Sequence, residues 1–369
     1  MKKRNVDHTM KKIISGLVIA SFAAALLTAC NGQGSTGQST PSVTPVLPDP
    51  PAEIREQAVP QHAAPFTGMP LHEKAEQRPA MVMLNNHPSA RPQSGISYAD
   101  VLYESLAEGE ITRIAAVYQS TDYGGPIGPV RSIRPYYIDL SKIYDALIIH
   151  AGGSPDAYQR LARQKPPYLD EITNAGGSFW RESFRKAPHN LYTDLTRIRT
   201  GADKLGHRED YAAPQAVPAF LHDELDKPGD PSSGVTVTFL LDSYKVAYKY
   251  DAQRKVYDRF VNDEPHEDLS NHEQLAATNV VILAARHIVL DNEGRRDIRL
   301  IGSGQGIVLQ RGKHDTVSWK RKDASDRFHL TRDGVEVGLY PGKTHYLIVP
   351  DAPSLDAHVE VAREATAAP

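Results

Sequence analysis

The sequence predicts an α/β N-terminal domain followed by a mostly β C-terminal domain, with a flexible segment ahead of both. Three observations support this prediction. Strand-like apolar runs alternate with helical spacing over residues 66–220, and short strand patterns separated by turn residues fill 232–352. Prolines and glycines punctuate the stretch between them. Alternating strands and helices are typical of layered α/β domains, whereas many short strands with turn signals are typical of sandwiches or barrels.

The elements of the N-terminal domain follow from local patterns. Short apolar runs predict strands, and apolar residues at helical spacing predict helices. Ser154 and Pro155 predict a further helix start, because serine suits the N-cap and proline suits the first helical position. The strands are expected at 80–84, 101–106, 114–119 and 146–150, and the other helices at 136–144 and 194–205.

The C-terminal domain is predicted to consist mainly of strands joined by turns such as Asp333-Gly334. The glycine-rich run 302–306 lies between predicted strands and opens no helix, so it is interpreted as a tight β turn and not as a nucleotide loop. Residues 353–369 are assigned to a C-terminal tail. The strands are expected at 235–241, 244–250, 256–260, 280–284, 288–290, 306–309, 316–320 and 345–349.

The first 65 residues carry a targeting pattern. Five lysines and arginines precede the apolar run Ile13–Leu27, and the tetrad Leu-Thr-Ala-Cys ends at Cys30. This pattern predicts a signal peptide over 1–29, and its end resembles the lipobox at which bacterial lipoproteins receive their acyl chains. Residues 30–65 are rich in Gly, Ser, Thr, Gln and Pro, which predicts a flexible tether. We therefore expect a lipid-anchored protein on the extracytoplasmic face of the cell membrane.

Composition excludes several classes of chemistry. The whole chain has a net charge of −3, and residues 1–29 contain five basic residues and one acidic residue, so the remainder carries −7. An acidic chain is a poor candidate for nucleic-acid binding, and no nucleic-acid partner is expected. Cys30 is the only cysteine, so lipidation leaves none for a disulfide, a zinc–thiolate site or a cysteine nucleophile. Histidine spacing matches no ligand motif, so neither a metal nor a cofactor is predicted.

Polar side chains concentrate between residues 85 and 154, at predicted strand ends and in Gly/Pro-rich turns. Ligand sites of α/β sheets form at such ends. The candidate ligand-binding residues are Asn85, Asn86, Arg91, Glu108, Arg113, Arg131, Ser132, Arg134, His150, Ser154, His189 and Asn190. The candidate catalytic residues are Glu104, Glu108, Glu110 and His150.

Several strings in the same region resemble the YerB-like family of bacterial lipoproteins. They include RPQSGISYADVLYESLAEGEITR (91–113), GPIGPVRSIRPYYIDL (125–140), HAGGSP and PHNLY, and the C-terminal half is similar in YDAQRKVYDR and PGKTHYLIVP. The resemblance covers nearly all of the predicted folded chain. It implies two tandem domains behind a lipid anchor, without an agreed catalytic activity.

Each polar cluster admits two interpretations. Arg131 and Arg134 could bind a carboxylate or phosphate, or could form structural ion pairs with nearby glutamates. Glu104, Glu108 and Glu110 could do acid–base chemistry, or could form a turn neutralised by arginines. Ser154 beside His150 could be a nucleophile, but a helix N-cap explains it equally.

The favoured interpretation is a binding module of the cell envelope. Its Arg-, Glu-, His- and Asn-lined site would take an anionic ligand, a glycan or a protein partner, and the membrane would be contacted through Cys30. The alternative is an envelope hydrolase or transferase that uses the glutamates with His150. A purely structural scaffold is a third possibility, if the polar residues prove fully paired.

Overall fold

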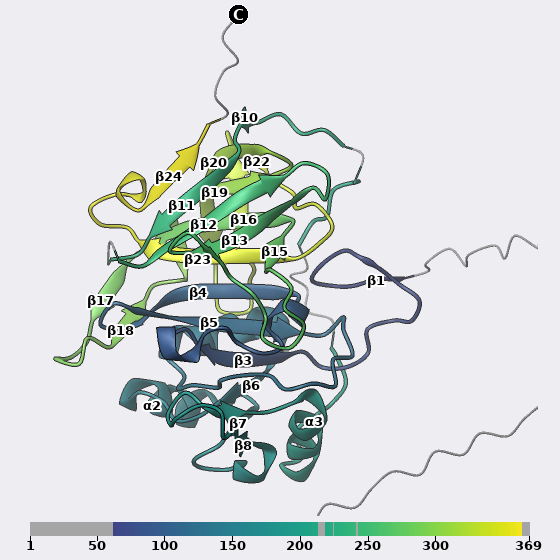
Figure 1. Ribbon diagram of the computed structural model, residues 1–369, viewed down its shortest axis with the longest axis vertical. Coiled ribbons are helices and arrows are strands. Elements are labelled where there is room, and N and C mark those ends of the chain that lie inside the picture. The colour runs from purple at the N-terminus through teal and green to yellow at the C-terminus, as the bar shows by residue number, and fades with distance from the viewer. Residues whose placement is uncertain (1–61, 213–217, 224, 241–242, 364–369) are drawn as a thin grey trace, which may run out of the picture. The chain divides into compact units, whose positions relative to one another are not determined.

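A twelve-stranded mixed sheet contains strands from both halves of the chain (Figure 1). The computed structural model describes residues 62–212, 218–223, 225–240 and 243–363, and these belong to one unit of the chain. The predicted signal peptide, Cys30 and most of the tether lie outside the described residues. The order of the strands along the large sheet is β22-β21-β20-β19-β16-β23-β4-β5-β3-β6-β7, with β10 pairing with β20.

The N-terminal half supplies five strands of this sheet and three α-helices. The predicted N-cap is confirmed, since Ser154 Oγ accepts a hydrogen bond from the Ala157 amide. The structure adds a second cap at Asp194, whose side chain accepts a hydrogen bond from the Arg197 amide. The strands are β3 (Ala80–Asn85), β4 (Val101–Glu108), β5 (Ile111–Tyr118), β6 (Leu147–His150) and β7 (Tyr168–Asp170). The helices are α1 (Pro135–Ser141), α2 (Pro155–Gln164) and α3 (Leu195–Lys204).

The C-terminal half is rich in strands. It contributes β10 (Asp230–Pro231), β16 (Asn279–Ala285), β19 (Gly302–Gln310), β20 (Lys313–Arg321), β21 (His329–Arg332), β22 (Val335–Glu336) and β23 (Thr344–Pro350) to the large sheet. A six-stranded sheet contains β11 (Gly234–Thr238), β12 (Lys245–Asp251), β13 (Val256–Val261), β14 (Glu264–Pro265), β15 (Ala276–Ala277) and β24 (Val359–Ala362).

Three strand pairs complete the set: β1 (His62–Ala63) with β2 (Pro70–Leu71), β8 (Trp180–Arg181) with β9 (Leu191–Tyr192), and β17 (His287–Val289) with β18 (Arg296–Ile298). Short 3-10 helices lie at η1 (Pro88–Ala90), η2 (Ile96–Tyr98), η3 (Lys142–Tyr144), η4 (Gly176–Ser178) and η5 (Leu355–Ala357).

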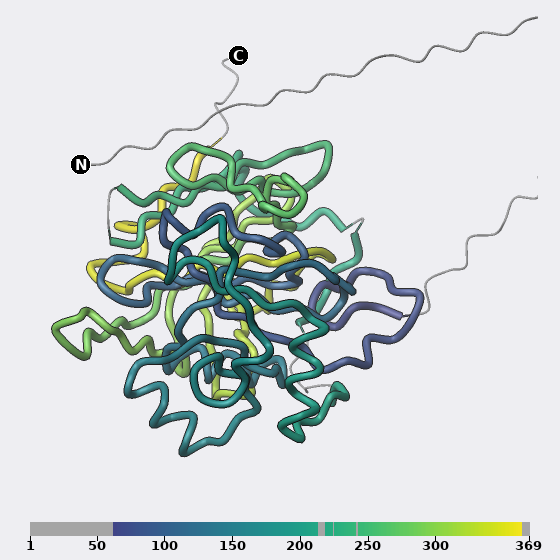
Figure 2. Tube along the Cα trace, turned by 60° about the horizontal axis from the view of Figure 1, so that its bottom comes forward, coloured from purple at the N-terminus to yellow at the C-terminus, as the bar shows by residue number. Residues whose placement is uncertain are grey.

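The two halves meet where β23 lies beside β4. These strands are parallel, with Thr344 opposite Val101 and Ile348 opposite Ser105. Both are buried along almost their whole length, as central parallel strands usually are. The yellow β23 accordingly lies against the blue β4 in Figure 1, and Figure 2 shows the same interleaving from a second direction. The regions predicted at 66–220 and 232–352 therefore share one continuous sheet.

The two faces of the large sheet are covered differently. Met81 and Met83 of β3 pack in one core with α1 and α2, whereas Val82 between them packs on the other face with α3. Farther along, Val280 and Ile282 of β16 pack against the six-stranded sheet. The helices thus lie on both faces of the N-terminal half, and a second sheet covers one face of the C-terminal half.

Two predictions for the C-terminal half need correction. The run 302–306 is not a turn, because it forms the start of β19. Gly304 lies opposite Trp319, and an added Cβ would come within 2.5 Å of the Trp319 indole nitrogen, so the glycine accommodates the buried ring. In addition, residues 353–363 are not a free tail, since β24 pairs with β11 and its alternating burial fits a strand.

Candidate functional site

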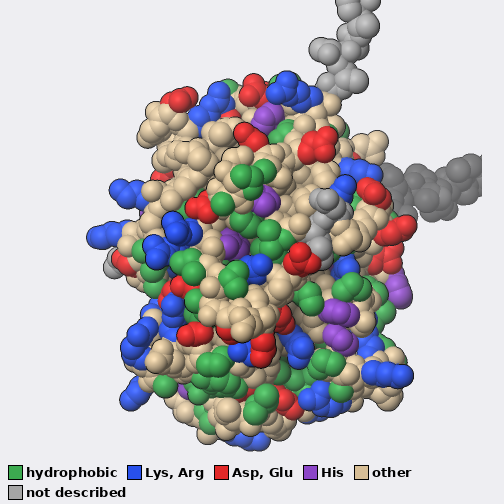
Figure 3. All heavy atoms as spheres, turned by 90° about the vertical axis from the view of Figure 1, so that its left-hand side faces the viewer, with side chains coloured by type: hydrophobic (Ala, Val, Ile, Leu, Met, Phe, Trp, Pro, Cys, Tyr) green, Lys and Arg blue, Asp and Glu red, His purple; other side chains and the backbone are tan. Residues whose placement is uncertain are grey.

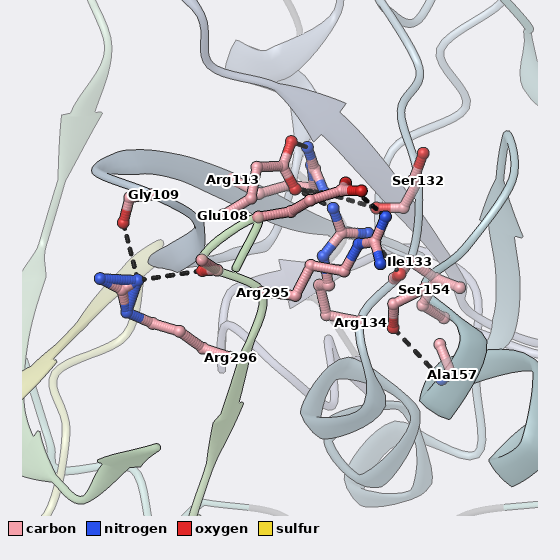
Figure 4. A network of polar contacts seen from close by, with 12 residues as sticks. Glu108, Gly109, Arg113, Ser132, Ile133, Arg134, Ser154, Ala157, Arg295 and Arg296 are labelled. Carbon is pink, nitrogen blue, oxygen red and sulfur yellow. Dashed lines mark hydrogen bonds and ion pairs between the residues drawn. The ribbon is translucent and has the colours of Figure 1, made fainter. Parts of the chain in front are cut away.

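Glu108 holds two arginines at the end of β4 (Figure 4). Its carboxylate accepts a hydrogen bond of 2.9 Å from Arg113 and forms an ion pair with Arg134. Each guanidinium also donates to a backbone carbonyl at 2.8 Å, Arg113 to Ser132 and Arg134 to Ile133. Burial lowers the pKa of both arginines. One carboxylate therefore neutralises only one of two closely placed positive charges.

A register shift in β4 directs Glu108 away from Glu104. The pairing of β4 with β5 is irregular between Leu106 and Glu108, and such bulges re-aim side chains. Glu108 consequently meets Arg134 at the start of α1, whereas Glu104 meets Arg259 of the six-stranded sheet. Glu110 is exposed on the turn before β5. The three predicted candidate acids thus lie in different surroundings and do not share one site.

Arg131 lies at the carboxyl ends of β3 and β6, which are neighbouring parallel strands. Its backbone amide donates to the Met83 carbonyl at 2.8 Å, and its carbonyl accepts from the Ala151 amide at 3.1 Å. The side chain is half-buried. Within the described ranges, no carboxylate is within ion-pair distance of it, and burial together with the nearby Arg113 lowers its pKa. Arg131 therefore holds a charge at the edge where sheets of this kind bind ligands.

Two histidines accompany Arg131. The rings of His87 and His189 stack with centroids 4.6 Å apart, and the Asn85 amide contacts His189 Nδ1 at 2.9 Å. The Ser89 backbone amide donates to His87 Nδ1. His87 Nδ1 accepts from the Ser89 amide, and His189 Nδ1 accepts when Asn85 donates its side-chain amide. Each ring, in its neutral form, therefore carries its proton on Nε2.

Positive charge dominates around His189. Burial lowers its pKa, and His87, Arg131 and Arg185 lower it further. Arg185 donates to the backbone carbonyls of Ala90 and Pro92, so its charge is not neutralised by those contacts. We call Arg131, Arg185, His87, His189 and Asn85 the cationic group. It places charged and neutral hydrogen-bond donors around His189.

Other predicted site residues have structural partners. His150 is fully buried, its Nδ1 lies 2.9 Å from the Gly152 carbonyl, and burial lowers its pKa against the opposing effect of Asp170. Ser154 is occupied as the N-cap of α2. Asn190 bridges Arg181 and the Glu182 carbonyl. His150 thus contacts the Gly152 carbonyl and Asp170, whereas Ser154 contacts the Ala157 amide, so the two side chains do not form a pair.

Glu104 is the centre of a buried polar network that joins the two halves of the chain. Its Oε2 accepts from Arg259 of β13 at 2.5 Å, and both side chains are only 2% exposed. Its Oε1 accepts hydrogen bonds from Thr112 at 2.7 Å, Tyr244 at 2.5 Å and Asn86 at 3.0 Å. Arg91 lies over the Tyr244 ring, with 5.3 Å between the guanidinium carbon and the ring centroid. Four donors therefore satisfy one buried carboxylate.

The remaining donors of Arg259 extend this network. Arg259 donates to His266 Nδ1 at 2.9 Å and to the Tyr248 hydroxyl at 2.7 Å. Tyr248 in turn contacts His345 Nδ1, and His266 Nε2 contacts the Gln93 amide oxygen. Burial and the Arg259 charge hold the pKa values of both histidines well below the ordinary range, so both rings are neutral. Burial disfavours the Arg259 charge, but Tyr248 and Glu104 outweigh this effect and raise its pKa.

The C-terminal members of this network were missed by the sequence analysis. Arg259, His266 and His345 lie more than 150 residues from Glu104 and match no motif with it. A signal was present in β4, where Glu104 interrupts a strand that is otherwise apolar on that face. A buried carboxylate requires a cation, but only the sheet topology reveals which one.

Two further findings concern the described residues. None of their helices is both long and apolar enough to cross a membrane. No three of their His, Asp or Glu side chains come together in an arrangement that could hold a metal ion.

Comparisons with known proteins agree with this architecture. Family models described as "Protein of unknown function (DUF3048)" match residues 66–208 for the N-terminal domain and 235–346 for the C-terminal domain. The chain belongs to this family. A Bacillus subtilis (strain 168) protein named "Putative lipoprotein YerB" is 36% identical over 304 residues, which cover 80% of this chain and 90% of that protein. The crystal structure of B. subtilis YerB aligns with a TM-score of 0.74 and 35% identity, covering 82% of this chain and all of the other.

The family membership places the Glu104–Arg259 pair between two tandem domains. Glu104 lies in the matched N-terminal domain, and Arg259 lies in the matched C-terminal domain. The YerB-like resemblance seen in the sequence is therefore confirmed. The expected tandem domains are also confirmed, and they share one sheet.

Replacement of Glu104 by glutamine is expected to destabilise the protein strongly. The substitution leaves the Arg259 charge buried without a counter-ion, which typically costs about 3–5 kcal/mol. Urea unfolding followed by circular dichroism measures this loss. The matched control is Glu110→Gln, an exposed position where a change within about 0.5 kcal/mol is expected. A Glu104→Gln protein as stable as this control would contradict the structural role of the pair.

Proposed function

We propose that this protein is a lipid-anchored lipoprotein of the cell envelope, and that its cationic group binds the oxyanion of an extracytoplasmic ligand. The anchor is supported by the signal-peptide pattern ending at Cys30 and by the lipoprotein name of the B. subtilis relative. The ligand class is supported by charge. Carboxylate, phosphate and sulfate groups on cell-wall polymers or partner proteins fit the donors of the cationic group.

The observation that supports the ligand most directly is the unpaired charge of Arg131. Guanidinium groups have planar donor arrays that match oxyanions with two parallel hydrogen bonds. Glu108 is already shared by Arg113 and Arg134, so it does not serve as a counter-ion for Arg131. A bound oxyanion would balance this local excess of positive charge. His87 and His189 would add Nε2–H donors beside it.

The charge distribution gives no support to a polyanion such as nucleic acid. Acidic, basic and histidine side chains are interspersed over the face shown in Figure 3. Nucleic-acid binding uses a continuous basic stripe that follows the phosphates, and the mixed charges of that face do not match such a stripe.

A Cys30→Ser substitution tests the anchor. The serine variant cannot form the thioether to lipid, so we expect it to incorporate no labelled fatty acid and to keep its signal peptide, running as a larger precursor. Metabolic labelling with a radioactive fatty acid, followed by immunoprecipitation and gel electrophoresis, measures both changes. Thr28→Ser, which alters the same segment without removing the thiol, is the control and should be labelled and processed like the wild type. Incorporation of labelled fatty acid into the Cys30→Ser variant would contradict lipid anchoring at this residue.

Sulfate titration tests the cationic group, because sulfate keeps its charge across the relevant pH range. An Arg131→Gln substitution should weaken sulfate binding about tenfold or more, as expected for loss of a charged hydrogen bond worth about 1.5–3 kcal/mol. Isothermal titration calorimetry gives the two dissociation constants. The control is Arg299→Gln, since Arg299 is exposed and makes no ion pair with another described residue. Equal affinities of the Arg131 variant and the wild type would refute the proposed site.

The same titration should depend on pH through His189. The pKa of His189 lies below the ordinary histidine value of about 6.5, so its ring is neutral at pH 7.5. The ring gains a proton only when the pH falls below the ordinary histidine value. The added charge attracts an anion, so sulfate should bind progressively more tightly as the pH is lowered stepwise from 7.5 to below the ordinary histidine value. His189→Gln should remove part of this increase. An increase of undiminished size in that variant would exclude His189 as the responsible group.

A further inference from the structure

A separate cavity lies at the amino end of β23, on the opposite edge of the sheet from Arg131. It has a volume of about 430 Å³, and its lining includes Ser97, Glu273, Gln274, Lys343 and His345. Small-molecule sites usually occupy about 300–1,000 Å³. The cavity is bounded by η2 from the N-terminal domain and by β15 and β23 from the C-terminal domain. Its walls thus come from both halves of the chain.

Lys343 supplies a positive charge to this cavity. Its ammonium group donates to the Ser97 carbonyl, and no carboxylate of the described residues lies within ion-pair distance of it. Burial lowers its pKa, although Asp100, Glu273 and Asp268 oppose this effect from a distance. An ammonium group has three N–H donors, so two remain for another acceptor.

His345 supplies a neutral donor whose proton position is fixed by the buried network. The side chain is 4% exposed, and its Nδ1 lies 3.0 Å from the Tyr248 hydroxyl. That hydroxyl accepts a hydrogen bond from Arg259, and His345 Nδ1 is the acceptor available for its own proton among the described residues. The proton of the neutral ring therefore resides on Nε2. That atom has no acceptor among the described residues, and His345 lines the cavity.

The rim of the cavity carries a negative charge, opposite in sign to that of Lys343. Glu273 is exposed, and its carboxylate accepts a hydrogen bond of 3.1 Å from Asn271. Its remaining acceptor sites are open to a donor at the cavity mouth. The cavity therefore combines two kinds of donor inside with a carboxylate at its entrance.

We propose that this cavity binds a small ligand with a carboxylate at one end and an ammonium group at the other, such as an amino acid or a short peptide. The ligand carboxylate accepts hydrogen bonds from Lys343 and His345, and the ammonium group pairs with Glu273. The charges of the site and the ligand are then complementary at both ends. This site is independent of the cationic group at Arg131.

An adjoining cavity gives the ligand room to extend. It has a volume of about 710 Å³, and both Lys343 and Arg254 line it as well as the smaller cavity. Met69 and Val256 provide apolar surface there. A side chain or a further residue of a peptide can therefore occupy the second cavity while its carboxylate stays at Lys343.

The dipeptide L-alanyl-L-alanine is a suitable probe, titrated into the full chain in detergent by isothermal titration calorimetry. We expect it to bind, its C-terminal amide to bind at least tenfold more weakly, and its N-acetyl form to bind more weakly than the free dipeptide. Lys343→Gln should reduce dipeptide affinity at least tenfold. Glu273→Gln should weaken binding of the free dipeptide but leave binding of the N-acetyl form unchanged, because only the free form has an ammonium group.

The controls separate this proposal from others. Lys322→Gln removes an exposed lysine outside the cavity and should leave dipeptide binding unchanged. Arg131→Gln should also leave it unchanged, so failure of the sulfate site and failure of this site are distinguishable. Circular dichroism establishes that each variant is folded. Absence of dipeptide binding to the folded wild type, equal binding of the dipeptide and its amide, or undiminished affinity of Lys343→Gln would overturn the proposal.

Discussion

The buried ion pair between Glu104 and Arg259 is the contact on which the arrangement of the two domains depends. Burying the Glu104 carboxylate without a partner would be strongly destabilising, so the arginine of β13 stabilises β4 at the centre of the sheet. Arg259 also donates hydrogen bonds to His266 and Tyr248. These hydrogen bonds fix the proton positions of the neighbouring rings. The pair thus specifies how the six-stranded sheet sits on the large sheet, in addition to the apolar packing around it.

This constraint leaves the two edges of the large sheet available for ligands. At the carboxyl edge, Glu108 forms ion pairs with Arg113 and Arg134. The neighbouring Arg131 has no counter-ion among the described residues. At the amino edge, His345 connects the buried network to a cavity through a ring whose tautomer the network determines. Both proposed sites would present donors to an anion, and the one at the amino edge is joined to the buried network through His345.

The sequence predicted the local features and missed the long-range ones. Apolar runs located β3, β4 and β6 because strand burial leaves a direct pattern, and capping chemistry located Ser154 because it acts within one helical turn. Arg131 was identified from its Gly/Pro-rich turn at a strand end. The pairing of β4 with β23 was not, because such pairing depends on topology across the whole chain. Gly304 was misassigned because a glycine that accommodates Trp319 in a strand has the same local signature as a turn glycine.

The most direct test of the central claim uses the two tryptophans, since Trp180 lies in the N-terminal family domain and Trp319 in the C-terminal one. Trp180→Phe and Trp319→Phe each leave one fluorescent reporter, and the fluorescence of each protein in a urea titration is compared with its own circular dichroism. We expect the shared sheet and the Glu104–Arg259 pair to make the domains one cooperative unit. Within each protein, fluorescence and circular dichroism will then give the same urea midpoint. Separate midpoints, with one domain unfolding while the other remains intact, would contradict the account.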